Sequence, residues 1–328
     1  MAKRKYSGKR SKMEASVMTI TTNTPTVQGG ATGSFTLDLS QVASLINRRF
    51  YRQGINWAVA GFKVFTSPGV SGQVSVKKLP NTWVTSNAWE KAFRAWNKQQ
   101  MEAIDDSGAE GGVARFRDFK VFADETHVTA GFGANLLPLD GQLPVAQPYA
   151  TGEWQESLIV VPNIIADASG STVNPFEYTL RMCGVNNFSG SRGIIDGYAQ
   201  SRAYPQSPDP VSPPLQNDTN WFKQMFDVGN DDTEVIDNAT NRNDDLPYPQ
   251  ADYPGGGVQA PAMQIHDIVG LSATTIGGIS RLKGGNFPCG LVRFDFTNAS
   301  ETTSNIAIQI DLVPGNHRGY LCEPMTEM

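Results

Sequence analysis

Residues 289–315 read CGLVRFDFTNASETTSNIAIQIDLVPG and carry the clearest alternating pattern of the chain. Apolar side chains occupy every second position in two runs, which are Val292, Phe294 and Phe296, then Ile306, Ile308, Ile310 and Leu312. Successive side chains of a β-strand point to opposite faces, so each run predicts a strand with one buried face. These two segments are the strongest strand signals in the sequence.

Six further segments extend the strand pattern outward from this stretch. They are SFTLDLS (34–40), NWAVAGFKVF (56–65), GQVSVKKL (72–79), RFRDFKVFA (115–123), QESLIVVPN (155–163) and PFEYTLRMC (175–183). In the first, the alternation places Asp38 on the polar face, opposite Leu37. In the last, it places Leu180 inward and Arg181 outward. Eight main strands with long connections predict an all-β fold, a single jelly-roll β-sandwich of two sheets.

A long helix interrupts the strands over residues 86–106, SNAWEKAFRAWNKQQMEAIDD. Its apolar stripe is formed by Trp89, Phe93 and Trp96. We expect this stripe to pack over the edge of a sheet, as such a spacing usually does. Asn87 with Glu90 is the predicted capping pair, and Gly108 is predicted to end the helix.

A short helix is predicted to begin at Ser40 and to stop at Gly54. The arginines expected in its last turns, interleaved with Phe50 and Tyr51, are Arg48, Arg49 and Arg52. Two interpretations of these arginines stay open. They complement the negative end of the helix dipole, or they extend a basic surface that binds nucleic acid.

The chain is predicted to divide into a flexible basic arm, residues 1–30, and one jelly-roll domain, residues 31–328. Residues 19–34 (TITTNTPTVQGGATGS) are expected to be extended and mobile. From about 185 to 257 the regular pattern fades into Pro-rich and acidic segments. We therefore expect one long loop excursion from the sandwich there, with a helical turn at NWFKQMF (220–226).

The first twelve residues, MAKRKYSGKRSK, contain six cations and no acid, although the whole chain has 27 basic and 32 acidic residues. The cations are Lys3, Arg4, Lys5, Lys9, Arg10 and Lys12. A segment this polar cannot bury enough apolar surface to fold alone, and it binds polyanions by displacing condensed counterions. The same composition suits a nuclear-import signal. A solvated tail without a partner is the remaining alternative.

Motifs for catalysis or metal binding are mostly missing. There is no P-loop, no nucleophile elbow and no zinc helix, and each histidine stands alone in the sequence: His127, His266 and His317. We therefore expect no enzyme activity, no cofactor and no metal site. One acidic segment keeps two weaker alternatives open, calcium between subunits and carboxylate chemistry on sugars. Its residues are Asp231, Asp232, Glu234 and Asp237.

The cysteines and the hydropathy pattern indicate the cellular compartment of the protein. Cys183, Cys289 and Cys322 form no CxxC pair and are odd in number, which predicts reduced thiols in a cytosolic or nuclear protein. No window approaches the length of apolar sequence that crosses a bilayer, and the start lacks the apolar run of a signal peptide. We expect no membrane insertion.

Four parts of the sequence resemble the coat proteins of small circular single-stranded DNA viruses that encode their own replication initiator. They are the arm MAKRKYSGKRSK, the threonine-rich lead into GSFTLDLS, the segment NRRFYRQGINWAVAGFKVF, and the ending GGNFPCGLVRFDFTNAS with NIAIQIDLVPGNHRGYL. The resemblance covers most of the chain in layout. It implies a jelly roll that self-assembles into an icosahedral virion shell of about 60 or more copies, with the arm on the packaged genome and assembly in the host nucleus.

Two other functions fit the same sequence. Coat proteins of small positive-strand RNA viruses share the plan of a basic arm before a β-sandwich. A cellular β-sandwich that binds glycans, with a nuclear-import tail, is an alternative of a different class.

Overall fold

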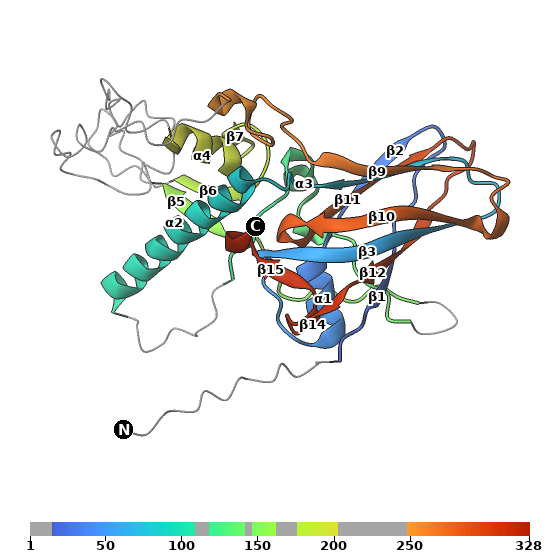
Figure 1. Cartoon of the computed structure of the whole chain (residues 1–328), viewed down its shortest axis with the longest axis horizontal. Helices are drawn as coiled ribbons and strands as arrows, with labels where there is room; N and C mark the ends of the chain where they lie inside the picture. Colours follow the sequence, from blue (N-terminus) through green and yellow to red (C-terminus); the bar gives the residue numbers. More distant parts are fainter. Residues whose placement is uncertain (1–14, 109–117, 142–145, 162–175, 203–247) are drawn as a thin grey trace, which may run out of the picture.

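The computed structural model describes residues 15–108, 118–141, 146–161, 176–202 and 248–328. It consists mostly of antiparallel β-sheets with a few helices (Figure 1). The all-β class predicted from the sequence is confirmed at this level. The six arm cations, the acidic residues between 231 and 237 and the turn expected at 220–226 lie outside the described residues. No helix within the described ranges is long and apolar enough to cross a membrane.

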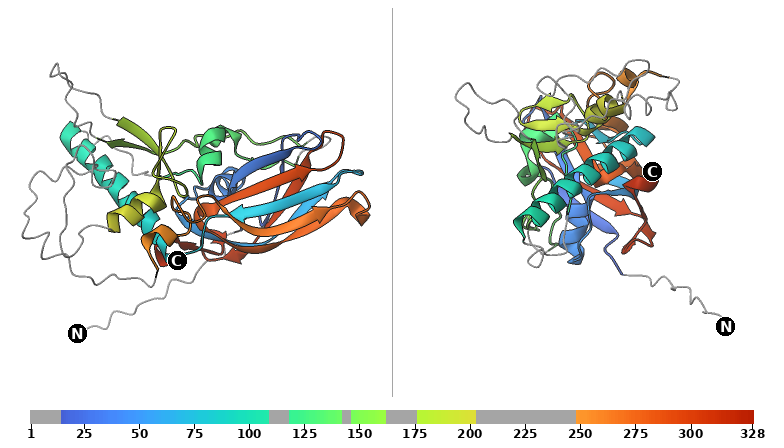
Figure 2. Two further views of the ribbon diagram at one scale, coloured as in Figure 1. Left: turned by 90° about the horizontal axis from the view of Figure 1, so that it is seen from above. Right: turned by 90° about the vertical axis from the view of Figure 1, so that its left-hand side faces the viewer.

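Two antiparallel sheets face each other and form the larger part of the molecule (Figure 2). The first has the order β1-β12-β3-β10, and β15 also pairs with β3. Its strands are β1 (Thr19–Asn23), β12 (Ile306–Leu312), β3 (Ile55–Thr66), β10 (Ile279–Phe287) and β15 (Cys322–Pro324). The second has the order β2-β11-β4-β9. Its strands are β2 (Thr32–Asp38), β11 (Leu291–Asn298), β4 (Gly72–Lys78) and β9 (Gln264–Leu271).

Apolar side chains from both sheets fill the space between them. Phe294 of β11 meets Phe62 of β3 edge to face, with ring centroids 5.5 Å apart. All the residues predicted to point inward from β11 and β12 are buried: Val292, Phe294, Phe296, Ile306, Ile308, Ile310 and Leu312. Burial of one such side chain contributes about 1.5–3 kcal/mol. The sequence prediction for this pair of strands is confirmed.

The described part of residues 79–263, between β4 and β9, forms an inserted region whose long helices and small sheet lie at one end of the two large sheets, while residues 136–139 run beside β1 and β2 (Figure 1). Its longest elements are α2 (Trp83–Ser107) and α4 (Ile194–Arg202). It also has a small sheet of order β5-β6-β8-β7. These strands are β5 (Leu158–Val161), β6 (Phe176–Arg181), β8 (Ser191–Gly193) and β7 (Asn187–Phe188). A second core joins the two helices to this sheet through Trp89, Ile159, Leu180 and Ile195.

The remaining elements are short. They are α1 (Leu39–Asn47), α3 (Glu125–Ala130), β13 (Pro314–Gly315), β14 (Gly319–Tyr320) and the 3-10 helices η2 (Phe132–Ala134), η4 (Gln250–Asp252), η5 (Ile276–Gly278), η6 (Pro288–Gly290) and η7 (Met325–Glu327). The last residues, including η7, lie beside α2 (Figure 1).

Helix α2 begins earlier than predicted. Thr82 is its cap, because its hydroxyl oxygen accepts a hydrogen bond from the Thr85 amide at 3.4 Å. Asn87 and Glu90, the predicted capping pair, lie inside the helix. Gly108 ends it in the left-handed conformation (φ 64°), as predicted.

Both predicted ends of α1 are wrong. The cap is Asp38, whose carboxylate accepts a hydrogen bond from the Ser40 amide at 2.9 Å. The helix stops at Asn47 because Arg48 takes the left-handed conformation (φ 52°, ψ 36°). Gly54 has a packing role instead, since a Cβ at this position would clash with the Trp89 ring.

Four strands of the two large sheets were not predicted from the sequence: β1, β9, β10 and the three-residue β15. β1 lies inside residues 1–30, which were assigned to the flexible arm; its only aliphatic residue is Ile20, so it shows no alternation. β9 and β10 are half-exposed at the sheet edges. In β10, Gly284 precedes Gly285, a pair that suggests a turn. Here the absence of a side chain has another cause, because a Cβ on Gly284 would clash with the β3 backbone.

The segments between β4 and β9 were also assigned incorrectly. Within residues 115–123, the described part forms no strand and only one isolated bridge, at Phe122. β5 and β6, counted as sandwich strands, belong to the small sheet. The excursion expected from 185 to 257 contains β7, β8 and α4 in its described part. Local patterns do not show which strands share a sheet, because pairing is a long-range contact.

Two side chains predicted to face solvent are fully buried. Arg181 is 0% exposed and donates hydrogen bonds to the Ser191 carbonyl and hydroxyl at 2.8 and 2.7 Å. Asp38 is also 0% exposed. Both predictions are wrong because other parts of the inserted region cover the side of β6 that carries Arg181 and the side of β2 that carries Asp38. A buried charge needs such partners, since burial without them is costly.

Candidate nucleic-acid interface

The loop that follows α1 carries Arg48, Arg49 and Arg52. Arg48 and Arg52 are exposed, and Arg49 is half-buried. The last turn of α1 contains no basic residue, so these arginines do not complement the helix dipole from within that turn. This correction follows from the early end of α1. Their position at the surface suits the other interpretation, contact with a polyanion.

The root of the arm, residues 15–18, is fastened beside this loop. The Val17 amide donates to the Asn47 side-chain oxygen at 3.1 Å, and the Tyr320 hydroxyl donates to the Val17 carbonyl at 2.7 Å. The Arg49 guanidinium donates to the Ser16 hydroxyl at 3.1 Å. The chain that leads to the six arm cations therefore starts next to Arg49.

A fourth arginine, Arg318, joins the three from the far end of the chain. Its guanidinium donates to the Phe50 carbonyl. Its own carbonyl accepts hydrogen bonds from the Tyr51 hydroxyl at 2.9 Å and the Ser16 hydroxyl at 2.8 Å. Sequence reasoning missed Arg318, because it stands alone in a glycine-flanked turn between β13 and β14. We call Arg48, Arg49, Arg52 and Arg318 the arginine cluster.

Buried aromatic rings pack beneath the loop that carries most of the arginine cluster. Tyr51 lies 5.7 Å from Trp57 and 5.5 Å from Tyr320, measured between ring centroids. All three side chains are at most 1% exposed. Burial raises the pKa of Tyr320 to about 12, so its hydroxyl stays protonated and donates to the root of the arm. The loop after α1 is thus held on packed side chains rather than left mobile.

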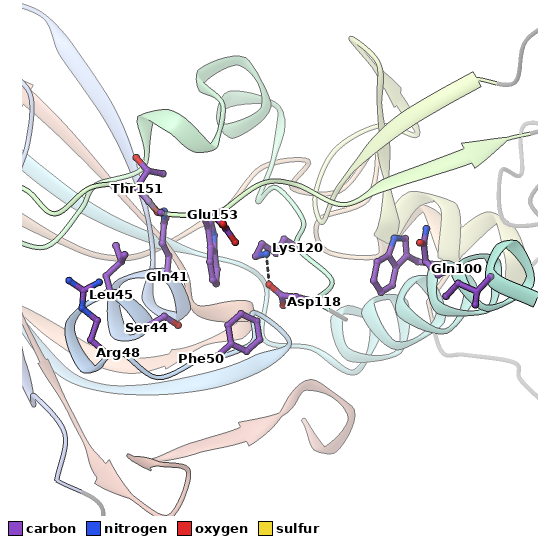
Figure 3. A pocket seen from close by; sticks show the side chains of 14 residues that line it. Gln41, Ser44, Leu45, Arg48, Phe50, Gln100, Asp118, Lys120, Thr151 and Glu153 are labelled. Carbon is purple, nitrogen blue, oxygen red and sulfur yellow. Dashed lines mark hydrogen bonds and ion pairs between the residues drawn. The ribbon is translucent and has the colours of Figure 1, made fainter. Parts of the chain in front are cut away.

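A polar hollow of about 620 Å³ opens next to Arg48 (Figure 3). Side chains of α1 line one side and α2 lines the other, with Lys120 and Asp118 paired between them (Figure 3). The Lys120 ammonium also lies 4.6 Å from the centroid of the Trp154 ring. Glu153 adds a second acid to the lining. Because two acids balance two cations, this polar hollow lacks the net positive charge that a phosphate needs.

Asp38 links the lining of the polar hollow, at Trp154, to the start of α1. Its second carboxylate oxygen accepts hydrogen bonds from the Gln53 amide at 3.0 Å and from the Trp154 indole at 3.2 Å. Burial raises the pKa of Asp38 to about 7, although the hydrogen bond from Gln53 favours the ionised form. Asp38 therefore orients Trp154 and caps α1, which are structural roles.

The groups best suited to acid–base or nucleophilic chemistry are committed to packing. His127 accepts a hydrogen bond from the Ala123 amide at Nδ1 (3.1 Å), so Nε2 donates to Asn135 (2.8 Å). Burial lowers the pKa of His127 to about 4, which keeps the ring neutral. Burial raises the pKa of both Cys183 and Cys289, so these free thiols stay protonated and unreactive.

The other histidines also have structural surroundings. His266 contacts the Gly284 carbonyl at 2.9 Å, and His317 is half-buried next to the Tyr51 ring. Within the described residues, no group of three or more His, Cys, Asp or Glu side chains could hold a metal ion. The calcium alternative concerned residues 231–237, outside this part of the chain.

The chain matches no protein-family model, no curated protein and no solved structure.

Proposed function

We propose that this protein is a structural capsid subunit that self-assembles into an icosahedral shell and encloses a single-stranded DNA genome. The observation that carries the proposal is the order of strand pairing in the two large sheets, beside the root of a basic arm.

Apart from the short β15, which adds to β3, the sandwich strands in chain order are β1 to β4 and then β9 to β12. β1 pairs with β12, β2 with β11, β3 with β10 and β4 with β9, so the pairs are nested one inside the other. Such nesting arises when one long antiparallel ribbon is wrapped into two sheets of four strands. It supports the jelly-roll assignment, an architecture found in viral capsid domains. The inserted region then occupies the tip of the ribbon.

The basic arm separates a capsid subunit from other jelly rolls, since lectin domains share the fold and a fold alone does not decide function. Removing the six arm cations from the 27 basic residues leaves 21, against 32 acidic residues. An acidic body repels nucleic acid, while a cationic arm binds it through counterion release. The arginine cluster extends the positive charge to the root of the arm, so the genome side of the shell is the side on which the arm leaves.

The resemblance to coat proteins of circular DNA viruses favours single-stranded DNA over RNA as the cargo. Counterion release does not distinguish the two, because both carry one phosphate per nucleotide. We place the protein in the virion, and in the host nucleus during assembly, with the arm as its import signal.

The test is electron microscopy of the purified full-length protein, followed by extraction of any enclosed nucleic acid. We expect closed shells whose nucleic acid is digested by DNase after extraction. Digestion by RNase alone would move the proposal to an RNA virus. A protein that stays monomeric in every buffer and binds no polynucleotide would contradict it.

A second experiment separates the arm from the body. Deletion of residues 1–12 should remove the larger part of the salt dependence of single-stranded DNA binding, because it removes six cations and leaves the four of the arginine cluster. The circular dichroism spectrum should not change, since β1 and its partners lie outside the deletion. The matched control keeps the length and replaces all six cations by glutamine. Unchanged DNA binding by both variants would refute the role of the arm.

A further inference from the structure

A second cavity, of about 640 Å³, shares Phe50 and Asp118 with the polar hollow and lies between the loop after α1 and helix α2. Four aromatic residues line it: Phe50, Trp89, Phe93 and Phe119. Its charged lining residues are Arg52, Arg94, Arg318, Glu90 and Asp118. We call it the aromatic hollow. Its volume is within the range of pockets that take small organic ligands.

The aromatic residues form a layered wall. Phe93 stacks on Trp89 with ring centroids 5.2 Å apart and planes 7° apart, and Phe119 meets Phe93 edge-on at 5.8 Å. Trp89 and Phe119 are buried behind the surface. Phe50 and Phe93 are half-buried, which leaves part of each ring open to the cavity that they line. Such a ring offers a flat face on which any nucleobase can stack.

The charge of the aromatic hollow differs from that of the polar hollow. Three arginines stand against two acids in its lining. Glu90 is paired with Arg94, and Asp118 is paired with Lys120 of the polar hollow and also lies near Arg52. Arg52 and Arg318 therefore give the aromatic hollow a net positive charge beside the rings. The guanidinium group suits phosphate, because its planar donors can bind two oxygens at once.

The aromatic hollow also lies at the root of the arm. Arg318 lines it, and the carbonyl of Arg318 accepts the hydrogen bond from Ser16. Arg49, one residue before Phe50, holds the same Ser16 hydroxyl. A polynucleotide bound by the arm therefore has a short path to the aromatic hollow.

We propose that the aromatic hollow binds one base of a single-stranded polynucleotide, stacked on Phe50 and Phe93, with the flanking phosphates on Arg52 and Arg318. This site rests on the proposed function, and deepens it by adding a base contact to the counterion release of the arm. It predicts that the protein prefers strands with bases to a bare phosphate backbone.

The test measures binding of full-length protein to a short oligothymidylate and to an abasic strand of equal length. Phe93→Leu keeps an apolar side chain but removes the stacking face. We expect about fivefold weaker binding of the oligothymidylate and unchanged binding of the abasic strand, since one stacked base contributes about 1–3 kcal/mol. The matched control is Phe176→Leu, whose exposed ring on β6 lies outside the aromatic hollow. Equal affinities of Phe93→Leu and the wild type for the oligothymidylate would overturn the base site.

Photocrosslinking of the wild-type protein tests the same site without any substitution that affects folding. Strands with 5-iododeoxyuridine should crosslink to peptides that contain Phe50 or Phe93, and crosslinks confined to residues 1–14 would overturn the proposal. The proposed function is judged separately, by shells with nuclease-protected DNA. Shells with DNA but no crosslink at these rings would remove the base site and leave the capsid function standing.

Discussion

Arg293 and Phe294 are neighbours on β11, yet they face two different interiors. Phe294 lies between the two large sheets, where it meets Phe62 within the apolar core of the sandwich. Arg293 points to the other side of the sheet and forms a buried ion pair with Asp124, with one N–O distance of 2.6 Å. Asp124 in turn caps α3 of the inserted region through the His127 amide, at 3.1 Å.

The comparison shows that the sandwich and the inserted region depend on different interactions. The sandwich core consists of alternating apolar residues, and apolar packing tolerates changes that conserve volume. The inserted region also has an apolar core, which reaches Leu291 at the start of β11, but its attachment to the sandwich includes buried charges and hydrogen bonds as well. Such contacts depend on complete sets of partners, because one missing partner leaves a charge buried alone. We therefore expect a single substitution or a change in pH to unfold the inserted region before the sandwich.

The strongest test of this difference is Arg293→Ala. The variant leaves the Asp124 carboxylate buried without its main partner, so the free energy of unfolding should fall by about 3–5 kcal/mol. The double variant Arg293→Met with Asp124→Asn should recover part of this loss, because it removes both charges together. Urea denaturation monitored by tryptophan fluorescence measures both values. A loss below about 1 kcal/mol for Arg293→Ala would mean that the ion pair does not hold the two regions together.

Trp89→Ala tests whether the inserted region can unfold locally while the sandwich stays folded. The substitution leaves a cavity beside Gly54 and Phe93 and should cost about 3 kcal/mol. Amide hydrogen exchange should speed up in α2 and β5 while β11 and β12 keep their protection. Phe176→Ala, at an exposed position of β6, is the matched control and should change stability by about 0.5 kcal/mol or less. Equal deprotection of β12 would show that the two regions unfold as one unit.

The smallest expected effect is a pH dependence of the free energy of unfolding that arises from a residue of the inserted region. His127 has its pKa lowered from 6.5 to about 4, so below pH 6.5 the unfolded chain binds a proton that the folded protein does not. His127 therefore contributes a loss of about 2 kcal/mol as the pH falls from 8 to 5. Asp38 contributes in the opposite direction, because its pKa is raised from 3.8 to about 7 in the folded protein, so the contribution of His127 is measured as a difference between two proteins. The comparison is with His127→Gln, which cannot titrate. Identical pH profiles of unfolding for the two proteins would show that His127 is not the group responsible.

The sequence predicted the sandwich, but it did not predict most of the inserted region. β11 and β12 were predicted correctly because apolar residues alternate over the whole of each strand and their apolar face is buried. Arg181 and Asp38 followed the same alternation and were predicted wrongly, because both faces of their strands are covered. β9 and β10 bury few side chains, so they gave no signal. In each case the pattern reports burial of a face, not membership of a sheet.

The candidate interface divides in the same way. The six arm cations and the trio Arg48, Arg49 and Arg52 are visible in the sequence as runs of charge. Arg318 is not, because its place beside Phe50 results from the contact of the chain's last turn with the loop after α1. The aromatic hollow likewise joins Phe50, Trp89 and Phe119 from three segments.

The amino-acid sequence by itself determined the β class, the core-facing residues of β11 and β12, and the cationic character of the arm. Those properties are local, since alternation and charge density are set by residues close together in the chain. The tertiary structure alone decided which strands pair, which charges are buried with partners, and which rings and arginines share one cavity. These features depend on contacts between residues hundreds of positions apart, such as Ser16 with Arg318, and no local pattern encodes such a contact.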